Sequence, residues 1–301
     1  MNVGVVGYGS IGARHARILS DAHHHVCVVS QRDEAPFITY RSLQKLLSSQ
    51  SIDYLVIASP TGSHRQDLED VSACGFTGRL LVEKPLLSTL APLPRLSVKR
   101  AAVGYNLRFH PTIQRLRNIV LSTERIESAS FVVGQHLEDW RPSRDYRTTY
   151  SARRVLGGGL LRDLSHELDL ARFLFGELTL HSAQEGRITE LDVDRPHEVT
   201  LHASSPSCAR ITVSMNMLDR PATRHIDVTF DEGVVRADLL TARLDERGIT
   251  SSDDADRDLT YRLLHREMTD GETRYAASFA DGLATVAFID SVEKALESVG
   301  I

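Results

Sequence analysis

The sequence predicts two folds in series: an α/β domain with a doubly wound parallel sheet, followed by an α+β domain with a mostly antiparallel, open sheet and helices. Up to about residue 105, short apolar runs alternate with helix-like segments. After about residue 125, longer runs alternate apolar and polar residues, which is typical of antiparallel strands with one face in water. With 301 residues the chain is long enough for two cores.

The first domain is expected to contain five strands joined by helical crossovers, because parallel strands need long connections. The predicted strands lie within 2–7, 25–30, 54–59, 79–84 and 101–106, and the predicted helices within 11–20, 41–49 and 64–74.

In the second domain, strands are expected within 127–135, 198–204, 209–217 and 225–240, and long helices only at 160–175 and 273–299. No repeat or low-complexity linker interrupts the sequence. We therefore expect two tightly joined domains, 1–105 and 106–301. In an alternative arrangement, the C-terminal helix packs back on the first domain.

Composition argues against several classes of partner. The formal charge is -5 and charges of both signs are interspersed, which disfavours nucleic acid as a partner.

Cys27, Cys74 and Cys208 are far apart and lack metal or disulfide spacing, so a reducing, cytoplasmic location is expected. No apolar run is long enough for a membrane span, and the first residues are expected to form a strand rather than a signal peptide.

A glycine-rich turn follows the first predicted strand and opens the first predicted helix. Its residues are Gly7, Gly9, Ser10, Ile11 and Gly12, in the spacing GxGxxG. Such glycines permit a tight turn and let the backbone approach a pyrophosphate at a helix N-terminus. An ordinary strand-to-helix turn is the alternative, but this context favours a dinucleotide-binding domain of the Rossmann type.

Residues at the end of the second strand are expected to determine the preference for NAD or NADP. An acidic residue there would bind the ribose of NAD, but the sequence has Ser30, Gln31 and Arg32. A hydroxyl and a guanidinium suit a ribose phosphate, which favours NADP over NAD. Asp33 would restore a preference for NAD if the strand ended later, and solvated loop residues remain the alternative for all four.

Five segments together resemble the glucose-fructose oxidoreductase, inositol dehydrogenase and rhizopine catabolism (Gfo/Idh/MocA) family. They are the glycine turn, ASPTGSH at 58–64, EKP at 83–85, GYNLRFHP at 104–111 and GGGLLRDLSHELD at 157–169. The resemblance covers nearly the whole chain. It implies a Rossmann domain followed by an open sheet that contacts the substrate and often forms an oligomer interface, here a homodimer or homotetramer.

The resemblance also implies the roles of several residues near the EKP segment. Lys84 would lie nearest both the nicotinamide ribose and the substrate hydroxyl, before a proline that is typically cis in the family. A partly closed cleft beside an oxidised nicotinamide would disfavour the ammonium form of this lysine and suit it to proton transfer. The cofactor contacts expected here are Ser59, Pro60, His64, Glu83, Lys84 and Pro85.

The predicted helix at 160–175 carries a second candidate group. Leucines and other apolar residues fall on one face, whereas Asp163, His166 and Asp169 recur every three residues on the other. Periodicity alone favours a solvated polar face. The family motif favours proton transfer instead, with His166 as the titrating group and Asp163 beside it.

The spacing inside this motif departs from the common family pattern, which places the histidine four residues after the aspartate. Here His166 follows Asp163 by three, so either residue could occupy the usual position. This variant, together with HLEDWRPSRDYRTTYSA at 136–152, resembles a subgroup associated with bacterial surface-sugar and nonulosonic acid pathways.

The 136–152 segment is rich in aromatic and basic residues, which bind sugar rings and anionic groups. Packing on the sheet is the equal alternative for this loop. The candidate substrate contacts, which complement Asp163 and His166, are Arg108, His110, Trp140, Arg141, Tyr146, Arg147 and Tyr150. Packing at the domain junction is the alternative for Arg108 and His110.

The sequence therefore predicts an NAD(P)-dependent oxidoreductase acting on a hydroxyl or keto carbon of a sugar, an acidic sugar or a nucleotide sugar. Lys84, His166 and Asp163 would be catalytic. Redox-neutral, dinucleotide-assisted elimination or glycoside cleavage is one alternative, and a non-catalytic dinucleotide sensor is another. No metal is expected, because three adjacent histidines at 23–25 do not converge on one ion.

Overall fold

The computed structural model describes residues 1–32, 35–140, 145–153, 157–187, 189, 191–194, 196–246, 248–252, 256–272 and 274–299. These residues form two compact units, and each unit is discontinuous in sequence. The first combines 1–109 with 257–283, and the second combines 110–256 with 284–301. The sequence suggested two continuous domains, so the segment 257–283 is the main difference.

The first unit is built on the predicted doubly wound parallel sheet. Its strands are β1 (Asn2–Val6), β2 (His25–Val29), β3 (Ile38–Tyr40), β4 (Tyr54–Ile57), β5 (Arg79–Val82) and β6 (Arg100–Val103). They lie in the order β3-β2-β1-β4-β5-β6, and every pairing is parallel. The short strand β3 was not predicted. The sheet confirms the α/β class of this unit.

Alternating side chains give this sheet two buried faces. On one face, Val3, Val5 and Tyr54 pack under α1 (Ser10–Asp21) and α8 (Leu259–Asp270). On the other face, Leu55 and Ile57 pack under α2 (Leu43–Ser49) and α3 (His64–Ala73). Apolar side chains on both sides explain why the strands appear in the sequence as continuous apolar runs.

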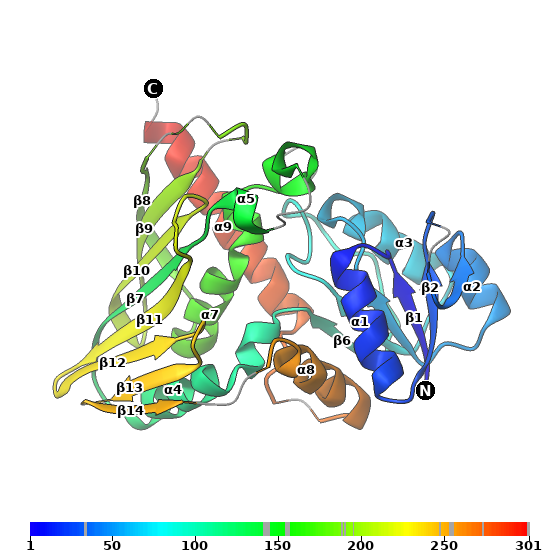
Figure 1. Ribbon diagram of the computed structural model, residues 1–301, viewed down its shortest axis with the longest axis horizontal. Helices are drawn as coiled ribbons and strands as arrows, with labels where there is room; N and C mark the ends of the chain where they lie inside the picture. Colours follow the sequence, from blue (N-terminus) through cyan, green and yellow to red (C-terminus); the bar gives the residue numbers. More distant parts are fainter. Residues whose placement is uncertain are drawn as a thin grey trace. The chain divides into compact units, whose positions relative to one another are not determined.

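Helix α8 is an unexpected part of this unit. It lies beside α1, although more than 200 residues separate the two helices in the chain (Figure 1). Leu264 and Met268 of α8 are fully buried in the sheet core. The connection from β5 to β6, all of which is described, contains no helix. A helix from the far end of the sequence thus covers sheet surface that a local crossover helix would otherwise cover.

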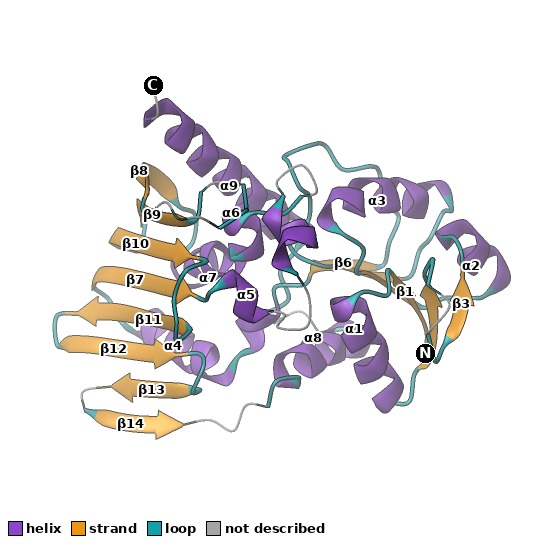
Figure 2. Cartoon of the chain, turned by 45° about the horizontal axis from the view of Figure 1, so that its top comes forward, coloured by secondary structure: helices purple, strands orange, loops and turns teal. Residues whose placement is uncertain are grey.

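The second unit contains an eight-stranded sheet. Its strands are β7 (Ile126–Gly134), β8 (Thr179–Glu185), β9 (Glu198–Ser205), β10 (Cys208–Asn216), β11 (Thr223–Phe230), β12 (Gly233–Asp238), β13 (Arg243–Glu246) and β14 (Ile249–Ser252). The order is β14-β13-β12-β11-β7-β10-β9-β8 (Figure 2). All pairings are antiparallel except that between β7 and β10, which confirms the mostly antiparallel prediction.

Helices cover one face of this sheet. They are α4 (Pro111–Ser122), α6 (Leu160–Asp163) and α7 (Ser165–Phe175). The rings of Phe131 on β7 and Phe175 on α7 meet edge to face at 6.2 Å. The remaining helices are α5 (Leu137–Trp140) and α9 (Phe279–Val299), and the division between the two units passes through α9.

Two helix predictions need correction. The expected helix 160–175 is interrupted at Leu164, whose φ of -97° and ψ of 23° are not helical, and its two parts are held by different ion pairs. The expected helix 273–299 begins only at Phe279. Among the described helices, none is both long and apolar enough to cross a lipid bilayer.

Candidate functional site

The glycine turn between β1 and α1 packs closely against neighbouring backbone. Gly7 has a φ of +90°, which favours glycine, and a Cβ there would lie 2.7 Å from the Ala58 carbonyl oxygen. A Cβ on Gly12 would lie 2.0 Å from the Gly7 carbonyl oxygen. The first turn of α1, which is fully described, contains no acidic residue. The turn can therefore present its N–H groups to an anion.

Arg32 and Arg41 both contact Ser30, which directly follows β2. The Ser30 hydroxyl accepts a hydrogen bond from the Arg32 backbone N–H at 3.0 Å, and Arg32 Nη1 donates to the Tyr8 carbonyl oxygen at 3.4 Å. Arg41 Nη1 donates to the Ser30 carbonyl oxygen at 3.1 Å, and Gln31 Nε2 donates to that of Arg41 at 2.8 Å.

Sequence reasoning identified Arg32 but missed Arg41, which reaches this position from beyond β3. That Arg41 lies close to Ser30 could be inferred only from the pairing of β3 with β2. Asp33, the residue that would favour NAD, lies outside the described residues.

His64 joins the loops that follow β4 and β5. One of its ring nitrogens, Nε2, lies 3.1 Å from the Ser59 carbonyl oxygen, and Nδ1 lies 3.1 Å from that of Pro85. Burial lowers the pKa of His64 more than hydrogen bonds to the Ser59 and Leu86 carbonyl oxygens raise it, so the neutral ring is favoured and donates from one nitrogen at a time. Ser59 also donates to Asp67, whose pKa burial raises. His64 therefore links the loop that follows β4 to the loop that follows β5.

Lys84 follows β5 and is half-buried, and its peptide bond to Pro85 is cis, as the resemblance implied. Its backbone N–H donates to Glu83 Oε2 at 3.2 Å. The other oxygen, Glu83 Oε1, lies 2.9 Å from Nε2 of His15 on α1. The Glu83 carboxylate thus connects α1 to the backbone of Lys84.

The predicted cofactor residues of the first unit all lie near the carboxyl ends of parallel strands. The glycine turn follows β1, Ser30 follows β2, Ser59 and Pro60 follow β4, and Lys84 follows β5. In doubly wound sheets this edge is where dinucleotides bind. The structure therefore brings the predicted cofactor residues to one edge of one sheet.

The polar residues of α6 and α7 are buried rather than solvated. Asp163 is 8% exposed, His166 is 9% exposed and Asp169 is 1% exposed. The solvated-face alternative is therefore wrong. Both faces of this segment lie inside the protein, and buried acids and imidazoles are uncommon without a specific purpose.

Two partly buried ion pairs that sequence reasoning missed involve residues of this segment. Arg224 on β11 donates to both oxygens of Glu167, at 2.7 and 3.0 Å. Arg162 on α6 donates to both oxygens of Glu293 on α9. The partners are remote in sequence, and only the tertiary fold brings them together.

Arg108 and His110, which the sequence offered as substrate contacts or packing residues, are both buried. Arg108 is 6% exposed, and its Nη1 lies 3.4 Å from Asp281. Burial tends to raise the pKa of Asp281, but Arg108 and hydrogen bonds from Ser278 outweigh it and lower the pKa. His110 is 6% exposed and precedes α4 as its N-cap residue.

In the 136–152 segment, several polar groups are already engaged within the second unit. Trp140 Nε1 donates to the Gln135 carbonyl oxygen at 3.1 Å, and Arg147 donates to Asp145 at 2.9 Å. The Tyr146 hydroxyl accepts from the Asp192 backbone N–H at 3.3 Å. Tyr150 begins a short 3₁₀ turn, and Arg141 lies outside the described residues.

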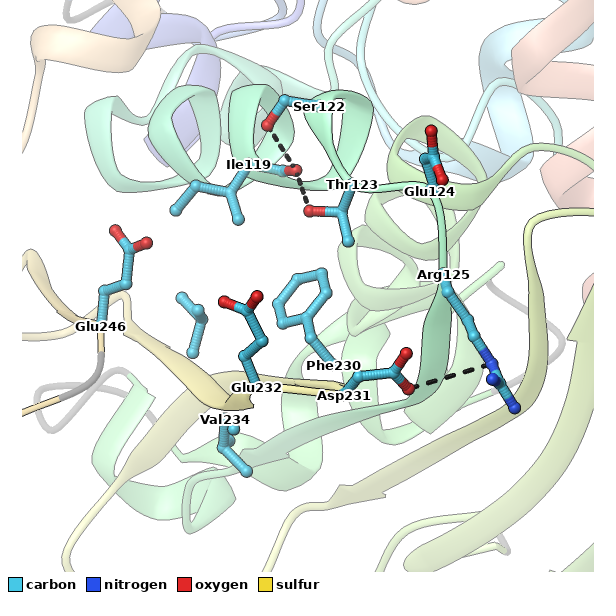
Figure 3. A pocket seen from close by; sticks show the side chains of 12 residues that line it. Ile119, Ser122, Thr123, Glu124, Arg125, Phe230, Asp231, Glu232, Val234 and Glu246 are labelled. Carbon is cyan, nitrogen blue, oxygen red and sulfur yellow. Dashed lines mark hydrogen bonds and ion pairs between the residues drawn. The ribbon is translucent and has the colours of Figure 1, made fainter.

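Among the hollows that described residues of the second unit line, two are large. One, of about 430 Å³, is lined by Tyr146 together with His136, Glu138, Arg187, Thr189, Leu191 and Leu218. The other, of about 580 Å³, lies between the end of α4 and β12. Its walls carry Glu124, Asp231, Glu232 and Glu246 (Figure 3). None of the predicted site residues lines the second hollow, so we assign it no catalytic role.

Comparison with family models adds evidence over most of the chain. Residues 1–106 match the oxidoreductase family model with an NAD-binding Rossmann fold, and residues 114–236 match the Gfo/Idh/MocA C-terminal domain.

Two curated relatives are sugar or polyol dehydrogenases. Myo-inositol 2-dehydrogenase of Thermotoga maritima is 27% identical over 59% of this chain and 55% of the relative. D-apiose dehydrogenase of Paraburkholderia graminis is 30% identical over 50% of this chain and 40% of the relative. The matched part of the chain thus spans about half the length of these relatives.

Solved structures share the fold over the whole chain. The WlbA dehydrogenase from Bordetella pertussis, solved with NADH and UDP-GlcNAcA, superposes with a TM-score of 0.79 at 18% identity, covering 100% of this chain and 97% of that one. UDP-N-acetylglucosamine 3-dehydrogenase from Acidithiobacillus ferrooxidans gives a TM-score of 0.75 at 19% identity, with 99% and 98% covered.

Proposed function

We propose that this chain, which belongs to the Gfo/Idh/MocA family of oxidoreductases, transfers a hydride between a nicotinamide dinucleotide and a hydroxyl-bearing carbon of a carbohydrate. The observation that carries the proposal is the shared sheet edge of the first unit. The glycine turn, the end of β2 and Lys84 all lie at that edge. The cradle around Gly7 and Gly12, which a Cβ would fill, suits a bound dinucleotide.

In the proposed reaction, the dinucleotide supplies the hydride acceptor or donor, and the protein handles the proton. During oxidation the carbon loses a hydride while its hydroxyl loses a proton to the Lys84 amine or to the His166 imidazole. Asp163 would orient the imidazole. The burial of Asp163 and His166 supports this role, because a water-poor site strengthens such interactions.

Replacing Lys84 tests this proposal directly. Lys84→Ala should lower kcat by roughly 10²–10⁴-fold and leave the Kd for the dinucleotide nearly unchanged, because it removes a proton carrier and no phosphate contact. Lys45→Ala, at an exposed lysine on α2, is the matched control and should behave like the unaltered protein. Turnover that survives in Lys84→Ala would refute the assignment.

For the substrate class, we propose a sugar, an acidic sugar or a nucleotide sugar. The relatives' names include a cyclic polyol, a pentose and UDP-linked sugars. A panel drawn from these three classes, read by dinucleotide absorbance, would identify the class. A bound dinucleotide that supports product formation without net reduction would instead favour redox-neutral elimination or glycoside cleavage. Inertness to the whole panel would favour the dinucleotide sensor.

For the cofactor, NAD binding follows from the family, and we propose a preference for NADP. The guanidinium groups of Arg32, on the Tyr8 carbonyl oxygen, and of Arg41, on that of Ser30, support it, because a ribose phosphate is a dianion with several acceptor oxygens. Removing both groups (Arg32→Ala with Arg41→Ala) should weaken NADP binding by about tenfold or more and leave NAD binding nearly unchanged. Equal loss for both dinucleotides would contradict the preference.

Two further points remain proposals from the resemblance and the composition. We propose that the chain forms a homodimer or homotetramer, which light scattering would measure. We also propose a cytoplasmic location, in keeping with the three dispersed cysteines.

A further inference from the structure

Four buried polar side chains form a continuous row through the first unit, and the proposed reaction leaves three of them without a role. Glu83 Oε1 lies 2.9 Å from His15 Nε2, and His15 Nδ1 lies 2.8 Å from His265 Nε2. His265 Nδ1 lies 2.9 Å from the Tyr54 hydroxyl. All four side chains are buried. Buried polar groups are costly without partners, so each hydrogen in this row needs a defined place.

The groups at the two ends of the row, Tyr54 and Glu83, determine which atoms in the row donate hydrogen bonds and which accept them. Burial raises the pKa of Tyr54 well above its usual value, so the hydroxyl keeps its proton. Burial, assisted by His15 and His24, lowers the pKa of His265 well below its usual value, so this ring is neutral and has one N–H. At the other end, the two oxygens of Glu83 face the backbone N–H of Lys84 and the ring of His15.

An arrangement with one hydrogen on each ring and none on the Glu83 carboxyl group satisfies every contact in the row. Tyr54 donates to His265 Nδ1, His265 Nε2–H donates to His15 Nδ1, and His15 Nε2–H donates to Glu83. The row is therefore a one-way series of donors that ends on an acceptor. Gly104 leaves room for that acceptor, since a Cβ there would lie 2.7 Å from Glu83 Oε1.

We propose that His15, His265 and Tyr54 are positioning residues that act through Glu83 to hold the backbone of Lys84 at a fixed place relative to the glycine turn. His15 belongs to α1, the helix that the glycine turn opens, whereas Lys84 follows β5. The Glu83 carboxylate bonds to both His15 and the backbone of Lys84. The hydrogen bonds among His15, His265 and Tyr54 hold that carboxylate in place. This inference rests on the proposed function, because it gives Lys84 the proton transfer.

Ring nitrogens report the arrangement without any assay of turnover. In ¹⁵N spectra of the full chain, His15 and His265 should both be neutral and protonated at Nε2. Their signals can be assigned by loss in His15→Gln and His265→Gln variants. Double protonation of His15, or a proton on Nδ1 of either ring, would overturn the donor row.

Kinetics test the positioning role. His15→Leu removes the donor to Glu83, whereas His15→Gln places an amide N–H near the position of the lost Nε2–H. We expect His15→Leu to lower kcat by about tenfold or more, because small misplacements of reacting groups are costly, with the dinucleotide Kd within about twofold. His15→Gln should recover most of the loss. Equal losses in the two variants would overturn the proposal.

Removing one hydroxyl provides a milder pair of variants that should both fold. Tyr54→Phe deletes the first donor of the row and should lower kcat several-fold, in keeping with the usual contribution of one hydrogen bond. Tyr40→Phe deletes a hydroxyl of the same sheet that accepts from Gln50 instead, and kcat should not change. Identical turnover in the two variants would exclude Tyr54 from the positioning role.

The outcomes separate this inference from the proposed function. Full turnover in Lys84→Ala would refute the role of Lys84 in proton transfer, and the ¹⁵N spectra would still establish or exclude the donor row. A large loss in Lys84→Ala with no effect of His15→Leu would retain the proposed function and overturn the positioning role alone.

Discussion

Gly9 and Gly12 differ in the space available for a side chain, and the difference separates folding from dinucleotide binding. A Cβ on Gly12 would lie 2.0 Å from the Gly7 carbonyl oxygen, whereas a Cβ on Gly9 would meet no atom within 4 Å. We expect Gly12→Ala to lower the thermal unfolding midpoint of the dinucleotide-free protein. Gly9→Ala should leave that midpoint unchanged and weaken dinucleotide binding, since the methyl group would occupy the approach of the pyrophosphate.

Differential scanning calorimetry without dinucleotide and titration with dinucleotide would separate the two effects. Gly75→Ala is a poor control because Gly75 has a φ of +63°, whereas Gly9 has no such backbone requirement. A Gly9→Ala variant that binds NAD and NADP normally would show that the backbone at this position does not approach the phosphates.

Two buried histidines predict how stability changes with pH. Burial lowers the pKa of His64 and of His265 below 6.5. In the unfolded chain these rings take up protons as the pH falls through 6.5, whereas the native rings do not. The free energy of unfolding should therefore be independent of these groups above that pH and should decrease below it.

Urea unfolding at several pH values between about 5 and 8 would measure this slope. His265→Gln removes one titrating group, so stability should fall less steeply with decreasing pH in that variant than in the unaltered protein. The half-buried carboxylate Asp281 has a lowered pKa and affects stability only at lower pH, below 3.8. An unchanged slope in His265→Gln would contradict the neutral, buried state of this ring.

At the scale of the element, α8 is a core helix of the first unit. Leu264 is fully buried there, so Leu264→Ala should destabilise the protein by about 2–5 kcal/mol. Leu121→Ala, at a leucine of α4 that is 64% exposed, is the matched control and should cost much less. Denaturant unfolding would compare the two. Similar, small effects would show that α8 does not contribute to the stability of the sheet core.

The ion pair between Glu167 on α7 and Arg224 on β11 gives a second prediction for the elements. Removing one partner leaves a buried charge without compensation, so Arg224→Ala should cost about 3–5 kcal/mol. Replacing both partners with apolar residues, as in Glu167→Leu with Arg224→Met, should recover much of that loss. A double variant as unstable as Arg224→Ala would show that the site needs the polar groups themselves.

The sequence predicted elements well where the signal was local. Apolar periodicity and the glycine turn located β1, α1 and most later strands. It missed α8, which has 12 residues like α1, because the sheet surface that this helix covers lies at the other end of the chain. It also missed the break at Leu164, since neither glycine nor proline marks it and the two ion pairs that hold the parts involve distant residues.

For the candidate site too, the sequence predicted what depends on local motifs and missed what depends on contacts between remote residues. Motifs located the glycine turn and Lys84, because these depend on short segments of backbone. They could not reveal that His15 lies against Glu83 and His265, which are 68 and 250 residues away. Nor could they show that Arg41 joins Arg32, because that depends on the pairing of β3. Contacts between remote side chains require the fold.

At the scale of the whole molecule, the first unit should not fold from its N-terminal part alone. A fragment of residues 1–109 lacks α8 and would expose the sheet face that Leu264 and Met268 cover. We expect this fragment to keep secondary structure, lose near-ultraviolet circular dichroism and bind a hydrophobic dye. Attaching 257–283 through a glycine-serine linker should restore a cooperative transition. A fragment 1–109 that folds cooperatively by itself would contradict this division.

The position of β7 also affects how the protein emerges during synthesis. This strand ends at Gly134, but its neighbours β10 and β11 end at Asn216 and Phe230. At roughly 5–20 residues per second, the ribosome needs on the order of ten seconds to complete both neighbours. For that interval β7 is a nascent strand with two unpaired edges, the state most open to intermolecular pairing. A chaperone that protects such edges would therefore improve the yield of native protein, and would do so before translation ends.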